Sequence, residues 1–138
     1  MGCGAGYAGD RIEPAVELAE RGQLDYLIFE CLAERTIALA QQQKLRDPSA
    51  GFDPLLEARM RRVLMPCAVH GTKIITNMGA ANPYAAAKLT AAIAREMGLH
   101  NLRIASITGD DVLAAVLEQN PQMIESGRHL ADYAPRLV

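Results

Sequence analysis

Short strand-like runs alternate with amphipathic helical segments along this chain, and this alternation restricts its fold more than any other feature. Strands are predicted over 24–31, 72–76 and 102–108, where branched or aromatic residues cluster between turn residues. Apolar stripes at helical spacing predict helices over 12–21, 33–46, from Pro54 on, from Pro83 to Gly98, and over 111–119. Strands that alternate with helices form parallel sheets. The sequence therefore predicts a Rossmann-like α/β fold, a parallel sheet with helices on both faces.

The composition suggests a thin hydrophobic core. The chain has 138 residues, enough for one compact domain, and 50% are hydrophobic, but only 4% are aromatic and none is Trp. Alanine supplies much of the apolar content, and small side chains each bury little area. We therefore expect a single α/β domain over residues 1–138 that is a piece of a larger folding unit, lacks a strand before Gly2, and forms homo-oligomers.

Charge and cysteine content exclude several classes of partner. The formal net charge is −2, and no basic cluster interleaved with aromatic residues provides the footprint that nucleic-acid binding needs. Arg59, Arg61 and Arg62 lie among apolar residues at helical spacing, which predicts a solvated helix face. No apolar run approaches the roughly 18–20 residues of a membrane span. Three widely spaced cysteines are typical of a reduced compartment, so we predict a cytoplasmic protein with no nucleic-acid or membrane partner.

The ligand crevice of an open parallel sheet lies outside the carboxyl ends of its strands. Here the loops at that edge are predicted to be 30–34, 77–82 and 108–111. The glycine-rich start, residues 2–10, would join them if it followed a strand.

Gly4, Gly6 and Gly9 match the G-x-G-x-x-G pattern of dinucleotide-binding loops, and Glu30 ends the next predicted strand, where a ribose-binding carboxylate is expected. The strand that should precede this pattern is missing from the prediction. A loop that binds another anion, or that only turns the chain, remains an alternative.

The loop from Asn77 to Pro83 is the second candidate binding segment. It enters a helix whose first N–H groups and positive dipole end favour anions. Asn82 as the N-cap and Pro83 at the first helical position explain this loop structurally, but Asn77 and Gly79 exceed what a cap needs. Asn77, Gly79 and Asn82 are therefore candidate binding residues.

Two carboxylates are candidate acid–base groups: Glu30, which ends an apolar strand, and Asp110, which follows another. Capping of the next helix by Asp110 or Asp111 is the alternative role of that pair. Cys67 and His70 are spaced like metal ligands, but no further ligand matches them, so no metal site is predicted.

Several motifs together resemble the acyclic terpene utilisation protein A family. They are the run 2–10, the run 24–30 with residues 32–34 and Thr36 after it, and the loop 76–83, and the resemblance extends to about Val138. Residues in matching motifs are Gly4, Gly6, Gly9, Asp10, Glu30, Glu34, Asn77, Gly79, Asn82 and Asp110. The resemblance implies a longer family domain, of which this chain is the N-terminal part. Proteins of this family are typically encoded beside biotin-dependent acyl-CoA carboxylases and enoyl-CoA hydratases, so the resemblance also implies a role in the catabolism of terpenes or related branched acids.

The function expected from these observations is the binding of a small anionic ligand, an acyl-CoA or a carboxylate, at the carboxyl ends of the strands. The reaction is left open, as is the cofactor. One alternative is an oxidoreductase that binds NAD(P) or a flavin through the glycine-rich loop. Another is a non-catalytic subunit of an acyl-CoA carboxylase assembly.

Overall fold

A computed structural model of the chain describes residues 1–136, which form two compact units. The first comprises Met1–Ser106, and the second begins at Ile107. The first unit holds the sheet. None of the helices that the structure describes is both long enough and apolar enough to span a membrane.

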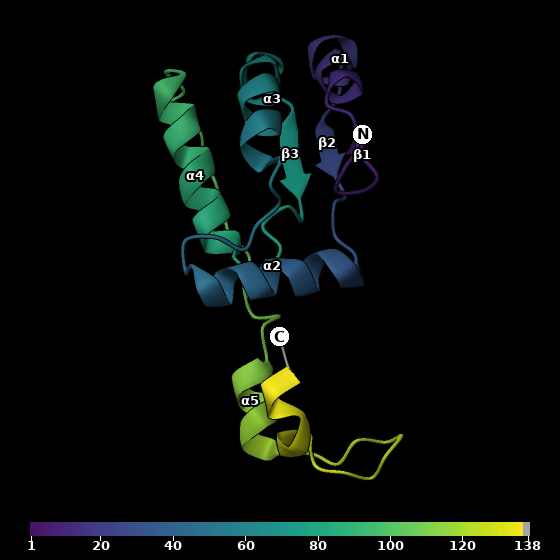
Figure 1. The fold of residues 1–138 in the computed structure, drawn as a ribbon. Helices are drawn as coiled ribbons and strands as arrows, with labels where there is room; N and C mark the ends of the chain where they lie inside the picture. Colours follow the sequence, from purple (N-terminus) through teal and green to yellow (C-terminus); the bar gives the residue numbers. More distant parts are fainter. Residues whose placement is uncertain (137–138) are drawn as a thin grey trace. The chain divides into compact units, whose positions relative to one another are not determined.

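The sheet contains three parallel strands in the order β1-β2-β3 (Figure 1). They are β1 (Gly2–Ala5), β2 (Tyr26–Phe29) and β3 (Lys73–Thr76). In register, Leu27 of β2 lies opposite Gly2 on one side and Ile74 on the other. The predictions of a parallel α/β fold and of strands within 24–31 and 72–76 are confirmed.

Two expectations about strands are wrong. The strand that was expected to be missing is present as β1, which begins at Gly2 and overlaps the first two positions of the glycine motif. Gly4 allows it to pack, because a Cβ atom there would come within 2.7 Å of Cε1 of the Phe29 ring. The segment 102–108 is exposed and belongs to no strand in the structure. Strand propensity depends on neighbouring strands to pack against, and this segment pairs with none.

The helices of the first unit lie close to their predicted bounds. They are α1 (Glu13–Arg21), α2 (Glu34–Arg46), α3 (Leu56–His70) and α4 (Pro83–Glu96). Helix α3 continues past Pro66 to His70 and is capped by Gly71, whose φ of 71° is the left-handed conformation that glycine adopts readily. Cys67 and His70 therefore both belong to α3.

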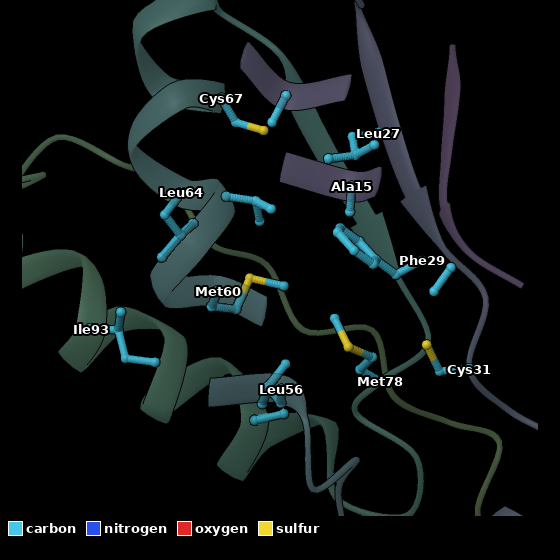
Figure 2. Packing of buried hydrophobic residues seen from close by; sticks show 14 of the residues in the cluster. Ala15, Leu27, Phe29, Cys31, Leu56, Met60, Leu64, Cys67, Met78 and Ile93 are labelled. Carbon is cyan, nitrogen blue, oxygen red and sulfur yellow. The ribbon is translucent and has the colours of Figure 1, made fainter. Parts of the chain in front are cut away.

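The core lies between the sheet and a layer formed by α1 and α3, which contact each other. Figure 2 shows Leu27 and Phe29 of β2 facing Ala15 of α1, with Met60 and Leu64 of α3 beside them. Ala15 is fully buried, and its small side chain lets α1 lie close to the sheet. Close approach thus offsets the low apolar area per residue that the composition implied.

The opposite face of the sheet is more open. Its side chains include Ile28, which is partly buried, and Tyr26 and Ile75, which are exposed. Among the described residues, both helices that contact strands, α1 and α3, lie on the other face, so helices cover one face and not both. Parallel sheets are normally covered on both faces. Self-association, which would cover this one, stays a prediction.

The second unit is small and contains α5 (Leu113–Gln119) and a 3-10 helix, η1 (Leu130–Arg136), which contact each other. Helix α5 is capped at its carboxyl end by Asn120, whose φ is 46° and whose Oδ1 accepts a hydrogen bond from the Ala131 N–H at 2.8 Å. Helix α5 has no buried residue.

Candidate functional site

A cavity of about 320 Å³ lies at the carboxyl ends of β2 and β3, inside the first unit. Small-molecule sites span about 300–1,000 Å³, so this one suits a small ligand. It is lined by segments that are far apart in the sequence: Ala8, Gly9, Cys31, Leu32, Thr36, Leu39, Ala40, Gln43, Phe52, Asp53, Pro54, Leu55, Asn77, Met78 and Ala80. The cavity thus lies at the predicted edge of the sheet.

Most of the lining is apolar. Leucine, phenylalanine, methionine and alanine side chains dominate, and the polar lining residues are Thr36, Gln43, Asp53 and Asn77. Thr36 is already engaged, because its hydroxyl accepts a hydrogen bond from the Ala33 N–H at 2.7 Å and caps α2. An apolar cavity with a few polar groups is the usual form of a site for a small organic molecule.

Helix α2 forms one wall of the cavity and runs across the ends of the strands (Figure 1). Nζ of Lys44, near the end of α2, donates a hydrogen bond to the carbonyl oxygen of Ala81 at 2.9 Å. After α2, Gly51 has a φ of 98°, and a Cβ atom there would come within 2.7 Å of Cβ of Lys44. Helix α2 is therefore held to the rest of the first unit through the loops that precede α3 and α4.

Arg59 is a fully buried arginine that does not line the cavity but contacts two residues that do. Its Nη2 atom donates to the carbonyl oxygens of Ala8 and Asp10, at 3.1 and 3.0 Å. Its Nη1 atom contacts Sγ of Cys31 at 3.2 Å and Sδ of Met78 at 3.5 Å. One side chain of α3 thereby joins the glycine-rich loop to the residues that follow β2 and β3.

Asp53 forms an ion pair with Arg59 and is only 6% exposed. Its Oδ2 lies 3.5 Å from Nη1 of Arg59, and its Oδ1 accepts a hydrogen bond from the Leu55 N–H at 2.7 Å. Burial raises the pKa of the Asp53 carboxyl, while the Leu55 hydrogen bond and the positive charge of Arg59 act in the opposite direction. Asp53 is thus a buried carboxylate that lines the cavity.

The sequence-predicted residues Glu30 and Asn77 are brought together beside the cavity. Nδ2 of Asn77 donates to Oε1 of Glu30 at 2.8 Å, and Oδ1 of Asn77 accepts from the Cys31 N–H at 2.7 Å. The Glu30 carboxylate also accepts from the Leu32 N–H at 3.2 Å. Asn77 lines the cavity, whereas Glu30 is exposed outside it.

The glycine-rich loop already holds a carboxylate. The Gly6 N–H donates to Oδ2 of Asp10 at 3.0 Å, and the Arg11 N–H donates to Oδ1 at 2.9 Å. These two bonds lower the pKa of the Asp10 carboxyl. Asp10 does not cap α1, whose N-cap is Ile12. Of the three motif glycines, Gly9 lines the cavity and Gly4 packs against Phe29.

Gly79 and Asn82 have structural contacts. A Cβ atom at Gly79 would come within 2.7 Å of Cα of Pro83, so only glycine lets the loop lie against α4. Asn82 caps α4 as predicted, since its Oδ1 accepts from the Ala85 N–H. Its Nδ2 donates to two carbonyl oxygens of the segment between α2 and α3, those of Pro48 and Ala50.

The remaining sequence candidates lie elsewhere. Asp110 belongs to the second unit and follows a segment that is not a strand. Cys67 is buried in the core, and its burial raises the pKa of the thiol to about 11. Within residues 1–136, no group of three His, Cys, Asp or Glu side chains is placed to hold a metal ion.

Sequence reasoning missed Arg59 and Asp53. The prediction of a solvated face holds for Arg61 and Arg62, which are exposed, but is wrong for Arg59. Its spacing was informative, because Arg59 falls between Leu56 and Val63 on the apolar stripe of α3. A charged residue within an apolar stripe either lies at the margin of the stripe or is buried and paired with an opposite charge. Arg59 is buried and paired with Asp53.

One comparison with known proteins gives a match. The whole chain, residues 1–138, matches the sequence profile described as "Acyclic terpene utilisation family protein AtuA". Neither the curated proteins nor the solved structures contain a significant match to the chain.

Proposed function

The chain belongs to the acyclic terpene utilisation family AtuA, and from this premise we propose that it binds the branched aliphatic chain of a terpenoid acid or acyl-CoA in the cavity beside α2. Family membership supports a role in acyclic terpene utilisation. The observation that carries the binding proposal is the apolar lining of the cavity. The proposal holds equally for an enzyme and for a non-catalytic subunit of an acyl-CoA carboxylase assembly.

The anionic end of the ligand is proposed to stay outside the cavity. A charge in apolar surroundings is costly unless it is paired. Inside the cavity a carboxylate would meet Asp53, which is itself acidic, and Arg59 does not line the cavity. The ligand would therefore insert its apolar chain and leave its carboxylate or thioester-linked CoA at the surface.

The glycine-rich loop gives little support to the alternative of a dinucleotide cofactor. In dinucleotide-binding loops the backbone approaches a pyrophosphate. Here the Gly6 N–H is bonded to the Asp10 carboxylate, an internal anion. A pyrophosphate would have to displace this carboxylate and would be repelled by it.

Calorimetric titration tests the proposal with citronellic acid, a branched acyclic acid, its CoA thioester, and NAD⁺. We expect the two branched compounds to bind and NAD⁺ not to bind. The absence of heat with both branched compounds, together with binding of NAD⁺, would overturn the proposal.

Two matched variants of α2 locate the binding. Leu39 lines the cavity and is 46% exposed, so Leu39→Trp should fill part of the cavity without disturbing the core. Leu45 lies on the same helix, does not line the cavity and is 63% exposed, so Leu45→Trp is the control. We expect Leu39→Trp to weaken binding of citronellic acid at least tenfold and Leu45→Trp to leave it unchanged. Equal effects of the two variants would place the ligand elsewhere.

A further inference from the structure

Asn77 has one hydrogen-bond donor left over at the cavity. Its side-chain amide offers one oxygen acceptor and two N–H donors. Oδ1 accepts from the Cys31 N–H at 2.7 Å, and one N–H of Nδ2 donates to Oε1 of Glu30 at 2.8 Å. The second N–H has no acceptor among the residues that the structure describes. Because Asn77 lines the cavity and is partly exposed, a ligand can reach this amide.

The two neighbours of Asn77 fix the orientation of its amide. A backbone N–H can bond only to the amide oxygen, and a carboxylate can bond only to the amide nitrogen. The Cys31 N–H and the Glu30 carboxylate therefore hold Oδ1 and Nδ2 in one orientation and exclude the flipped one. A ligand meets an N–H donor at this position, and the matching ligand atom is an oxygen acceptor.

Glu30 restricts the charge of that oxygen. The two N–H bonds of an amide nitrogen diverge by about 120°, so an oxygen that accepts the second one lies about 5 Å from Oε1 of Glu30. Like charges at this separation repel each other. Of the described residues that line the cavity, none is Lys, Arg or His, so no lining cation offsets the repulsion. A carboxylate oxygen is disfavoured here, whereas a neutral carbonyl oxygen is not.

We infer that Asn77 donates its second N–H to the carbonyl oxygen of the ligand head, and that Glu30 makes the site favour a neutral thioester carbonyl over a free carboxylate. The head lies at the mouth of the cavity, between Asn77, which lines it, and Glu30, which is exposed outside it. This inference rests on the proposed function, because it assumes that the aliphatic chain fills the cavity and leaves its head at the surface. It chooses between the acid and the acyl thioester.

Calorimetric titration at neutral pH compares citronellic acid with the methyl ketone of the same skeleton. The two compounds have nearly the same shape, but the ketone carries no charge and no donor. We expect the ketone to bind at least about threefold more tightly than the acid, which is the size of the repulsion between two exposed charges about 5 Å apart. The N-acetylcysteamine thioester, which lacks the phosphates of CoA, should bind at least as tightly as the ketone. An acid that binds as tightly as the ketone, or more tightly than the thioester, would overturn the inference.

Glu30→Gln tests whether the charge causes the preference. The introduced amide keeps an oxygen that can accept from Asn77 and from the Leu32 N–H. We expect the acid to bind at least about threefold more tightly to this variant than to the wild-type protein, and the ketone to bind equally to both. Glu20→Gln is the control, because it removes the same charge from an exposed residue in the last turn of α1, at the amino ends of the strands. A preference that is unchanged in Glu30→Gln would overturn the inference.

Asn77→Asp in the Glu30→Gln background tests the donor. The introduced glutamine can donate to the introduced aspartate, so the bond between the two positions is kept with its direction reversed. The aspartate still accepts from the Cys31 N–H but has no N–H for the ligand. We expect the ketone to bind about fivefold more weakly than to Glu30→Gln alone, the loss typical of one neutral hydrogen bond. Equal affinities would overturn the role of Asn77. If the double variant does not fold, the comparison of Glu30→Gln with the wild-type protein decides.

The outcomes separate the inference from the proposed function. Binding of the acid and the ketone with equal affinity would overturn the selection by Asn77 and Glu30 and leave the proposed function standing. No binding of either compound or of the thioester would overturn both.

Discussion

Replacing Arg59 by methionine tests whether the buried guanidinium holds the cavity together. Methionine keeps much of the aliphatic volume but removes the charge and all donors. The Asp53 carboxylate would lose its counter-charge, and the carbonyl oxygens of Ala8 and Asp10 would lose their donors. We expect a large loss in the free energy of unfolding together with loosening of the glycine-rich loop.

The structure sets the size of this effect. Arg59 is 0% exposed, and removing one partner of a buried ion pair typically costs about 3–5 kcal/mol. The Asp53 carboxyl can avoid part of this cost by taking up a proton, because burial already raises its pKa. The two freed carbonyls add about 1 kcal/mol or more each when they stay buried. A total of about 3–5 kcal/mol is therefore expected.

Urea denaturation followed by circular dichroism measures the change. With a slope of about 2 kcal/mol per molar urea, the midpoint of Arg59→Met should fall by roughly 2 M. Arg62→Met is the control, because Arg62 is exposed on the same helix, and it should change stability by less than about 0.5 kcal/mol. The double variant Arg59→Met/Asp53→Asn should recover about 1–3 kcal/mol, since the unpaired charge is gone. Similar stabilities for Arg59→Met and Arg62→Met would refute the reasoning.

Three further predictions concern the amino-terminal segment. Gly4→Ala should lower the free energy of unfolding by about 1–3 kcal/mol, because the new methyl group forces the Phe29 ring to move. Gly6→Ala should lower it far less, because nothing lies within 4 Å of the new methyl group. Chemical denaturation compares the two variants, and equal losses of stability would contradict the packing role of Gly4. Cys3 should be the one thiol that reacts promptly in the native protein, because Cys31 and Cys67 are buried and burial raises the pKa of both thiols to about 11. A thiol assay with and without denaturant measures this, and three fast-reacting thiols in the native state would refute it. The pKa of the Asp10 carboxyl is lowered in the folded state, so this carboxylate should stabilise the fold above its ordinary pKa and cease to do so as the pH falls through the lower folded value. Asp10→Asn should therefore be less stable than the wild-type protein at neutral pH and equally stable in strong acid. A difference in stability that stays constant across the pH range would exclude this role of Asp10.

The arrangement of β2, β3 and their helices could be predicted because local patterns specify it. The run Tyr26–Phe29 has the branched and aromatic residues that strands favour, and Asn82 with Pro83 marks the start of α4. The pairing of Glu30 with Asn77 follows from the same logic, since both residues come directly after neighbouring parallel strands.

The centre of the site could not be predicted, because its interactions join residues distant in the sequence. Arg59 is buried because Asp53 balances its charge and the carbonyls of residues 8 and 10 accept its hydrogen bonds, and no local pattern encodes the contact with those carbonyls. The strand β1 was missed for a related reason. Its glycines have low intrinsic strand propensity. Gly4 is nevertheless required in the strand, because the Phe29 ring of the adjacent strand occupies the space that a side chain would need.

The half-covered sheet has a practical consequence. Cys3 lies opposite Ile28 in the register of β1 and β2, on the open face, and its thiol is exposed. A fluorophore attached there would stand on the surface that a parallel sheet normally conceals. Its emission would report when another copy of the chain, or any further segment, covers that surface, and the concentration at which this occurs would give the strength of the association directly.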